Sequence, residues 1–251
     1  MLNYNLPKSL SITKYNISGE DVSIFPWFEP IWDVNGNIIA LELLSRIYET
    51  ESSKKVDPEL FFRNINPDLG LEIFLWQQRL ISTLKLNDKV NGLIISVNVQ
   101  RDVAELLYSR KLLTSINVPC CIRYEISENF YSSSRFPLDD HLIRYLADYC
   151  PLWLDDFGIG CINMMWGLSG QFSGIKISQQ FLHFSLCNNA RKSFFECLIT
   201  HLNMLYEQVV IEGVSDFKIF NEFKGVDFPA FQGWLLPGFG VDNIPDRFNA
   251  L

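Results

Sequence analysis

Short runs of apolar and β-branched residues alternate along the chain with longer stretches in which apolar residues recur every three or four positions. The short runs predict β-strands, and the longer stretches predict helices that bury one face. The predicted strands are residues 24–32, 38–44, 93–98, 121–126, 152–155, 174–177, 209–212 and 230–232. The predicted helices are residues 68–86, 138–149 and 190–206. Strands that alternate with helices indicate βα units.

The number of strands and the chain length together predict a closed barrel. Eight strands within 251 residues fit a (β/α)8 barrel, an α/β fold in which parallel strands are surrounded by helices. Between the first two strands stands Asn35-Gly36, a strong hairpin signal. A hairpin makes one of its strands antiparallel to the other, so we expect a modified TIM barrel with one antiparallel strand.

Polar side chains stand where most of the predicted strands end. In chain order they are Glu42, Asn98, Glu125, Asp155, Asp156, Lys176, Glu212 and Gln232. In a βα-barrel the C-terminal strand ends form one ring, so residues far apart in the sequence meet there. Taken singly, each is equally typical of a solvated loop or turn. A whole ring is harder to explain in that way, because a carboxylate buried without a partner is costly.

The acidic and amide members of this ring offer oxygen ligands without His or Cys. Such ligands favour hard divalent ions, Mg²⁺ or Mn²⁺, over zinc. The adjacent Asp155 and Asp156 could help to hold a pair of ions, as in two-metal hydrolases. Phosphodiester cleavage is the reaction that best uses such a pair. His141, His183 and His201 have no mutual ligand spacing, and we expect them to be ordinary core or surface residues.

Composition limits the other classes of function. Hydrophobic residues make up 48% of the chain and charged residues 20%, as in a folded globular protein. The net charge of −8 argues against a broad basic surface for a nucleic-acid polymer. The six cysteines form no C-x-x-C pair, which fits a reducing compartment. No stretch has the length of a membrane span or the apolar segment of a signal peptide, so we expect a cytoplasmic protein.

Several motifs in these strands resemble those of the EAL-domain cyclic-di-GMP phosphodiesterases of bacteria. They are Glu42-Leu43-Leu44-Ser45-Arg46, Ser96-Val97-Asn98, Glu125-Ile126-Ser127-Glu128, Asp155-Asp156-Phe157-Gly158, Ile175-Lys176-Ile177, Glu212-Gly213-Val214 and Gln232-Gly233-Trp234. Their order matches that of the family. The resemblance implies a lead-in segment over residues 1–24 and an EAL domain over 25–251. It is strongest to the stand-alone EAL proteins of enteric bacteria that influence motility and fimbriae.

The resemblance also implies roles for individual residues. The implied metal ligands, for two Mg²⁺ or Mn²⁺ ions, are Glu42, Asn98, Glu125, Asp155, Asp156 and Glu212. Lys176, Glu212 and Asp156 would serve catalysis, in which an activated water attacks phosphorus and cyclic-di-GMP opens to linear pGpG. Arg46, Leu44 and Gln232 would bind the substrate. Glu128 would brace the loop that follows Asp156.

Departures from the family pattern keep two other functions open. Ile159 stands where the family has threonine, Ser215 where it has glutamate, Glu29 where it has glutamine and Ser178 where it has aspartate. None of these positions is an implied metal ligand. The leading hypothesis is an active phosphodiesterase. The alternatives are a weak or inactive receptor for cyclic-di-GMP and a regulator that acts by binding another protein, whose identity the sequence does not reveal. Family resemblance further suggests a homodimer, formed through the region after the Asp-Asp-Phe-Gly loop.

Overall fold

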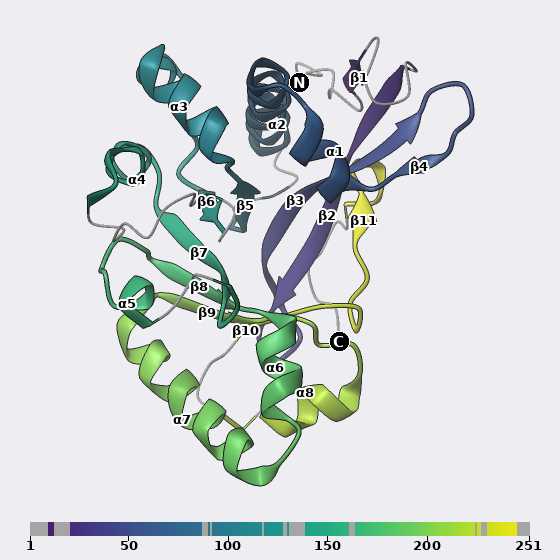
Figure 1. Cartoon of the computed structure of the whole chain (residues 1–251). Coiled ribbons are helices and arrows are strands. Elements are labelled where there is room, and N and C mark those ends of the chain that lie inside the picture. Colours follow the sequence, from purple (N-terminus) through teal and green to yellow (C-terminus); the bar gives the residue numbers. More distant parts are fainter. Residues whose placement is uncertain are drawn as a thin grey trace.

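The strands of the chain close into a barrel that is surrounded by helices (Figure 1). The computed structural model describes residues 10–12, 21–86, 90, 92–116, 118–127, 130, 139–160, 164–223, 225–226 and 230–244. The eight barrel strands are β2 (Val22–Trp32), β3 (Ile38–Glu49), β5 (Ile94–Asn98), β6 (Ile122–Ile126), β7 (Leu152–Phe157), β8 (Gly174–Ile177), β9 (Gln208–Ile211) and β10 (Ala230–Gln232). Around them lie α1 (Pro58–Asn64), α2 (Pro67–Leu86), α3 (Arg101–Ser109), α4 (His141–Ala147), α5 (Met164–Gly167), α6 (Gln179–Ser185), α7 (Asn189–Leu205) and α8 (Phe217–Phe223).

The strand pairing confirms the expected modified TIM barrel. Strands β3 and β5 to β10 run parallel to one another, whereas β2 is antiparallel to both β3 and β10 and closes the ring. The turn between β2 and β3 is built by Asp33, whose Oδ1 accepts hydrogen bonds from the backbone N–H groups of Asn35 at 2.8 Å and Asn37 at 2.9 Å. Gly36 supplies the positive φ of 80° that this turn requires.

Apolar side chains, of which Trp153 is the largest, fill the barrel interior beneath the polar strand ends. The cluster consists of Ile31, Ala40, Trp153, Val210 and Ala230. Trp153 is 1% exposed, and a Cβ atom on Gly174 of the neighbouring strand would lie 2.5 Å from its indole ring. The glycine therefore makes room for the tryptophan, and the filled interior supports the polar residues above it.

The first hairpin is longer than the apolar pattern predicts. Strand β3 continues five residues past Leu44 to Glu49, and its ladder with β2 extends to the pair Val22 and Glu49. This extension has its own apolar cover, because Phe61 of α1 and Trp76 of α2 pack against its buried side chains. The region outside the barrel thus forms one wall of a cleft, described below.

Three short strands and two 3-10 helices complete the described structure. Strands β1 (Leu10–Ile12) and β11 (Phe239–Gly240) pair with β2, and β4 (Lys55–Val56) pairs with β3. The 3-10 helices are Leu112–Thr114 and Val241–Asn243. None of the helices formed by the described residues combines the length and the hydropathy needed to span a membrane.

Candidate active site

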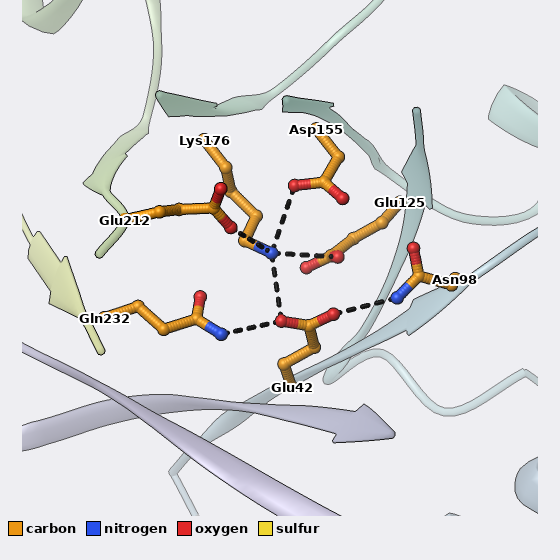
Figure 2. A network of polar contacts seen from close by, with 7 residues as sticks. All are labelled: Glu42, Asn98, Glu125, Asp155, Lys176, Glu212 and Gln232. Carbon is orange, nitrogen blue, oxygen red and sulfur yellow. Dashed lines mark hydrogen bonds and ion pairs between the residues drawn. The ribbon is translucent and has the colours of Figure 1, made fainter. Parts of the chain in front are cut away.

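Seven of the predicted site residues meet at the C-terminal end of the barrel (Figure 2). Glu42 lies in β3, Asn98 ends β5, Glu125 lies in β6, Asp155 in β7, Lys176 in β8, Glu212 follows β9 and Gln232 ends β10. Each lies in, or directly after, a different strand. The barrel therefore brings together residues that are up to 190 positions apart in the sequence.

Lys176 stands at the centre of the cluster. Its Nζ atom lies 3.0 Å from Glu42 Oε2, 3.1 Å from Glu125 Oε2, 3.1 Å from Asp155 Oδ1 and 2.9 Å from Glu212 Oε1. The side chain is 1% exposed. One ammonium group therefore faces four carboxylates, and together they carry a formal charge of −4 + 1 = −3.

Glu42 is held from both sides by amide groups. Asn98 Nδ2 donates to Glu42 Oε1 at 2.8 Å, and Gln232 Nε2 donates to Glu42 Oε2 at 2.7 Å. Burial alone would raise the pKa of Glu42, but Lys176 and these two amides hold it below its usual value. Glu42 is therefore the member of the cluster that is fixed as a carboxylate.

The other three carboxyl groups experience the surplus of negative charge. Burial and the neighbouring Glu42 raise the pKa of Glu125 well above its usual value. Burial likewise raises the pKa of Asp155, and it raises that of Glu212 to about 8, although Lys176 opposes both shifts. The same carboxylates outweigh the effect of burial on Lys176 and raise its pKa. More positive charge than one lysine supplies is needed to keep all four groups ionised.

A β-bulge in β7 directs both adjacent aspartates toward the cleft. The register slips between Leu154 and Phe157, so that β7 has one residue more than β8 over this stretch. Asp156 takes up the irregularity with a φ of 59°, a left-handed conformation that non-glycine residues adopt infrequently. In a regular strand, successive side chains point to opposite faces. With the bulge, Asp155 and Asp156 both line the same cleft.

The cleft above the cluster has a volume of about 820 Å³. Asn98, Asp155 and Asp156 line it at the barrel end, and Leu44 and Arg46 line it from the extension of β3. The Arg46 guanidinium carbon lies 4.3 Å from the centre of the Trp27 ring, which holds this cation in place by stacking. The guanidinium of Arg46 therefore lines the same cleft as the carboxylates of Asp155 and Asp156.

Glu29 belongs to the same cleft, although it is absent from the predicted set. It lies on β2 directly opposite Glu42 in the antiparallel ladder. Burial and Glu42 raise its pKa, while Arg46 and Gln232 act in the opposite direction. The sequence does contain a signal for this contact. Glu29 and Glu42 stand at nearly equal distances before and after the Asn35-Gly36 turn, so a hairpin at that turn places them opposite each other. The predicted loop support, Glu128, lies outside the described residues.

The oxygen atoms of the cluster are suitable ligands for divalent cations, provided that Lys176 moves away from some of the carboxylates. Among the described residues, no three His, Cys, Asp or Glu side chains are arranged to hold a metal ion as they stand, since Lys176 fills the space between the carboxylates. The remaining oxygen atoms nevertheless suit Mg²⁺ or Mn²⁺. Glu125 Oε1 is buried without a hydrogen-bond partner in the described part of the chain, and the cluster has an excess of negative charge. A bound cation would give Glu125 Oε1 a partner and would reduce the excess of negative charge.

Among curated proteins, the chain is similar to a phosphodiesterase and to a regulatory factor. It is 26% identical over 214 residues to the cyclic di-GMP phosphodiesterase PdeH of Escherichia coli K12, covering 84% of this chain and 82% of PdeH. It is 21% identical over 220 residues to the anti-FlhC(2)FlhD(4) factor YdiV of Salmonella typhimurium LT2, covering 87% of this chain and 92% of YdiV.

Solved structures and the family comparison agree on the fold. The crystal structure of the EAL-like domain protein YdiV superimposes with a TM-score of 0.76 at 20% identity, over 87% of this chain and 93% of YdiV. The structure of the PaMucR phosphodiesterase in its c-di-GMP complex has a TM-score of 0.69 at 19% identity, and the match covers 88% of this chain and 94% of the PaMucR chain. The EAL domain family matches residues 16–237, most of the length. The chain therefore belongs to the EAL domain family.

Proposed function

We propose that the protein is a metal-dependent phosphodiesterase that hydrolyses cyclic-di-GMP to linear pGpG. The observation that carries this proposal is the buried cluster of four carboxylates, whose charge one lysine does not balance. The cleft above it has the size of a small-molecule site. Similarity to PdeH supports cyclic-di-GMP as the substrate. In the cell, this activity would lower the second messenger and thereby influence motility, biofilm or fimbriae.

The proposed ligands of two Mg²⁺ or Mn²⁺ ions are the oxygen-bearing residues of the cluster. They are Glu42, Asn98, Glu125, Asp155, Asp156 and Glu212. When bound, such ions stabilise charge on a phosphoryl group and lower the pKa of water. Because Lys176 Nζ now lies among the carboxylates, its side chain has to withdraw from some of them when the site is loaded. It would then be placed to orient the attacking water or to neutralise developing charge.

The remaining roles follow from position and chemistry. Arg46 would bind a phosphate oxygen, for which its planar guanidinium is well suited. Leu44 would line the substrate site beside it, and Gln232 would keep Glu42 in place. Glu212 would accept the proton of the attacking water, since it is a carboxylate at the barrel end, 2.9 Å from Lys176 Nζ and next to the proposed ions. We assign this activity to an EAL domain over residues 25–251, preceded by the lead-in segment 1–24.

A direct assay tests the proposal. Purified protein incubated with cyclic-di-GMP and either Mg²⁺ or Mn²⁺ should yield linear pGpG, and chelation of the metal should stop the reaction. Glu42→Ala should lower turnover at least a hundredfold, because it removes a metal ligand. Glu72→Gln, on the exposed face of α2, is the matched control and should retain full activity. Absence of pGpG with both metals would refute the proposal.

Similarity to YdiV favours a second candidate function, regulation by binding another protein. The relative is named as a factor that acts against the FlhC(2)FlhD(4) complex, and its structure covers most of this chain. A receptor for cyclic-di-GMP without hydrolysis is the intermediate case. Binding of the purified FlhD and FlhC proteins, retained in Glu42→Ala, would favour the regulator. Tight binding of cyclic-di-GMP without pGpG would favour the receptor.

A further inference from the structure

A lysine and a cysteine from distant parts of the chain contact each other where β6 begins. Lys85 lies in the last turn of α2, and its Nζ donates a hydrogen bond to Cys120 Sγ at 3.2 Å. Cys120 is exposed to solvent, as are Cys187 and Cys197 elsewhere in the chain. An exposed thiol beside a cation differs from an ordinary surface cysteine, because the cation stabilises the thiolate, which is the reactive form.

The backbone around Cys120 is fixed at the surface. Ile122 N–H donates to Pro119 O at 3.0 Å, which closes a tight turn over Cys120. Arg123 Nη1 donates to the carbonyl oxygens of Cys120 at 3.0 Å and Ile122 at 2.9 Å. The turn therefore keeps the Cys120 thiol both in contact with Lys85 and accessible to molecules in solution.

The surroundings distinguish Cys120 from the two other thiols nearby. The hydrogen bond from Lys85 lowers the pKa of the Cys120 thiol, and Arg123 acts in the same direction. Burial raises the pKa of Cys121, and it raises that of Cys150 to about 12. Of these three cysteines, Cys120 is the one that is both accessible and favoured as a thiolate.

We propose that Cys120 is a site of reversible S-thiolation, at which a low-molecular-weight disulfide such as glutathione disulfide forms a mixed disulfide. The Cys120 thiolate attacks one sulfur of the reagent, a new S–S bond forms as the old one breaks, and the departing thiolate takes a proton from water. Lys85 is the positioning residue, since it holds the attacking group as a thiolate. A reducing thiol reverses the step. Cys120 precedes β6, whereas Glu125 lies near the far end of that strand, so the site is separate from the proposed active site.

Mass spectrometry of the folded full chain, resolved for each cysteine, tests the site. With glutathione disulfide at pH 7, the mixed disulfide should form faster at Cys120 than at the equally exposed class of thiol at Cys187, and dithiothreitol should remove it. Lys85→Met should lower the thiolate fraction of Cys120 about 1.5- to 5-fold, the range of one exposed ion pair. The reaction should slow by a smaller factor, because a more basic thiolate is a better nucleophile.

The pH dependence of alkylation separates the charge of Lys85 from a structural effect. Iodoacetamide reacts with the thiolate, so the alkylation profile of Cys120 should move to higher pH in Lys85→Met. Lys85→Arg keeps the cation and should restore the wild-type profile. Lys218→Met, which removes an exposed lysine of α8, is the matched control and should leave the profile unchanged.

Two results would overturn the site. One is equal rates of mixed-disulfide formation at Cys120 and Cys187. The other is an alkylation profile of Cys120 that Lys85→Met does not move. Neither result bears on the hydrolysis of cyclic-di-GMP, which is measured separately.

Discussion

At the scale of single residues, we expect the role of Lys176 to change when metal binds. In the metal-free protein it is the cation that makes burial of four carboxylates tolerable, because its Nζ lies within 3.1 Å of each. A buried charge without a partner is strongly destabilising, whereas a satisfied one is nearly neutral. Divalent ions would take over this compensating role and free the lysine for the substrate.

Lys176→Met should therefore destabilise the metal-free protein more than the metal-loaded one. We expect a loss of about 3–5 kcal/mol in the free energy of unfolding with a chelator present, since the variant removes the partner of buried charges. Added Mn²⁺ should restore part of this loss. Urea unfolding with and without the metal measures both.

Lys192→Met is the control for the loss of an ion-paired lysine at the surface. Lys192 contacts Glu196 and Glu222, and its side chain is 29% exposed. Its replacement should cost no more than about 1 kcal/mol in either condition. An equally small cost for Lys176→Met would contradict the view that this lysine holds the metal-free cluster together.

At the scale of elements, apolar runs predicted the eight barrel strands, Asn35-Gly36 predicted the antiparallel hairpin, and the polar strand ends predicted the residues that gather around Lys176. This was possible because barrel strands are apolar runs and their polar ends stand out against them. Periodicity missed the bulge in β7, since Asp156 at a φ of 59° leaves no mark in an alternating pattern. It also missed short helices such as α6, whose seven residues give too little periodicity. Glu29 joins the site through the strand register, which follows from its spacing about the Asn35-Gly36 turn and not from the apolar pattern alone.

The cap of α4 gives a prediction about pH. Asp140 is 4% exposed, accepts a hydrogen bond from Leu142 N–H at 2.9 Å and pairs with Arg101 Nη1 at 2.8 Å. Burial alone would raise the pKa of Asp140, but these hydrogen bonds lower it. A carboxyl group with a depressed pKa stabilises the fold at pH values above about 4, the ordinary value, and this stabilisation is lost as the pH falls through the folded pKa.

Asp140→Asn keeps the capping oxygen and removes the charge. The variant should lose roughly 1.5–3 kcal/mol of stability at pH 7, the contribution of a hydrogen bond to a charged group. The difference in Tm from the wild type should narrow as the pH falls below about 4 and through the lowered pKa of folded Asp140, because Asp140 then becomes neutral in both states of the wild-type protein. Asp139→Asn, at the exposed neighbouring position, should match the wild type throughout. A difference in Tm that is independent of pH would contradict the charge-based explanation.

At the scale of the whole molecule, part of the net negative charge is concentrated at one end of the barrel. Of the 29 acidic residues behind the net charge of −8, four surround Lys176 at the barrel end, and Asp156 and Glu29 line the same cleft. This concentration repels an anionic ligand while the site is empty of metal. Two divalent ions, together with Lys176 and Arg46, would bring the formal charge of this set to −6 + 2 + 4 = 0. We therefore expect metal binding to precede binding of the dinucleotide.

The association of two chains is the remaining prediction at this scale. Family resemblance suggests a homodimer through the region after the Asp-Asp-Phe-Gly loop, and there Met164 is 45% and Leu168 57% exposed. Apolar side chains in such a position would be buried by a second copy, whereas a carboxylate would be costly in the same interface. In analytical ultracentrifugation at micromolar concentration, the wild type should sediment with twice the mass of the monomer. The Leu168→Glu variant should sediment with the mass of the monomer. Met204→Glu, at the 80% exposed end of α7, should leave the dimer intact. A monomeric wild type would exclude the homodimer, and a dimeric Leu168→Glu would move its interface away from α5.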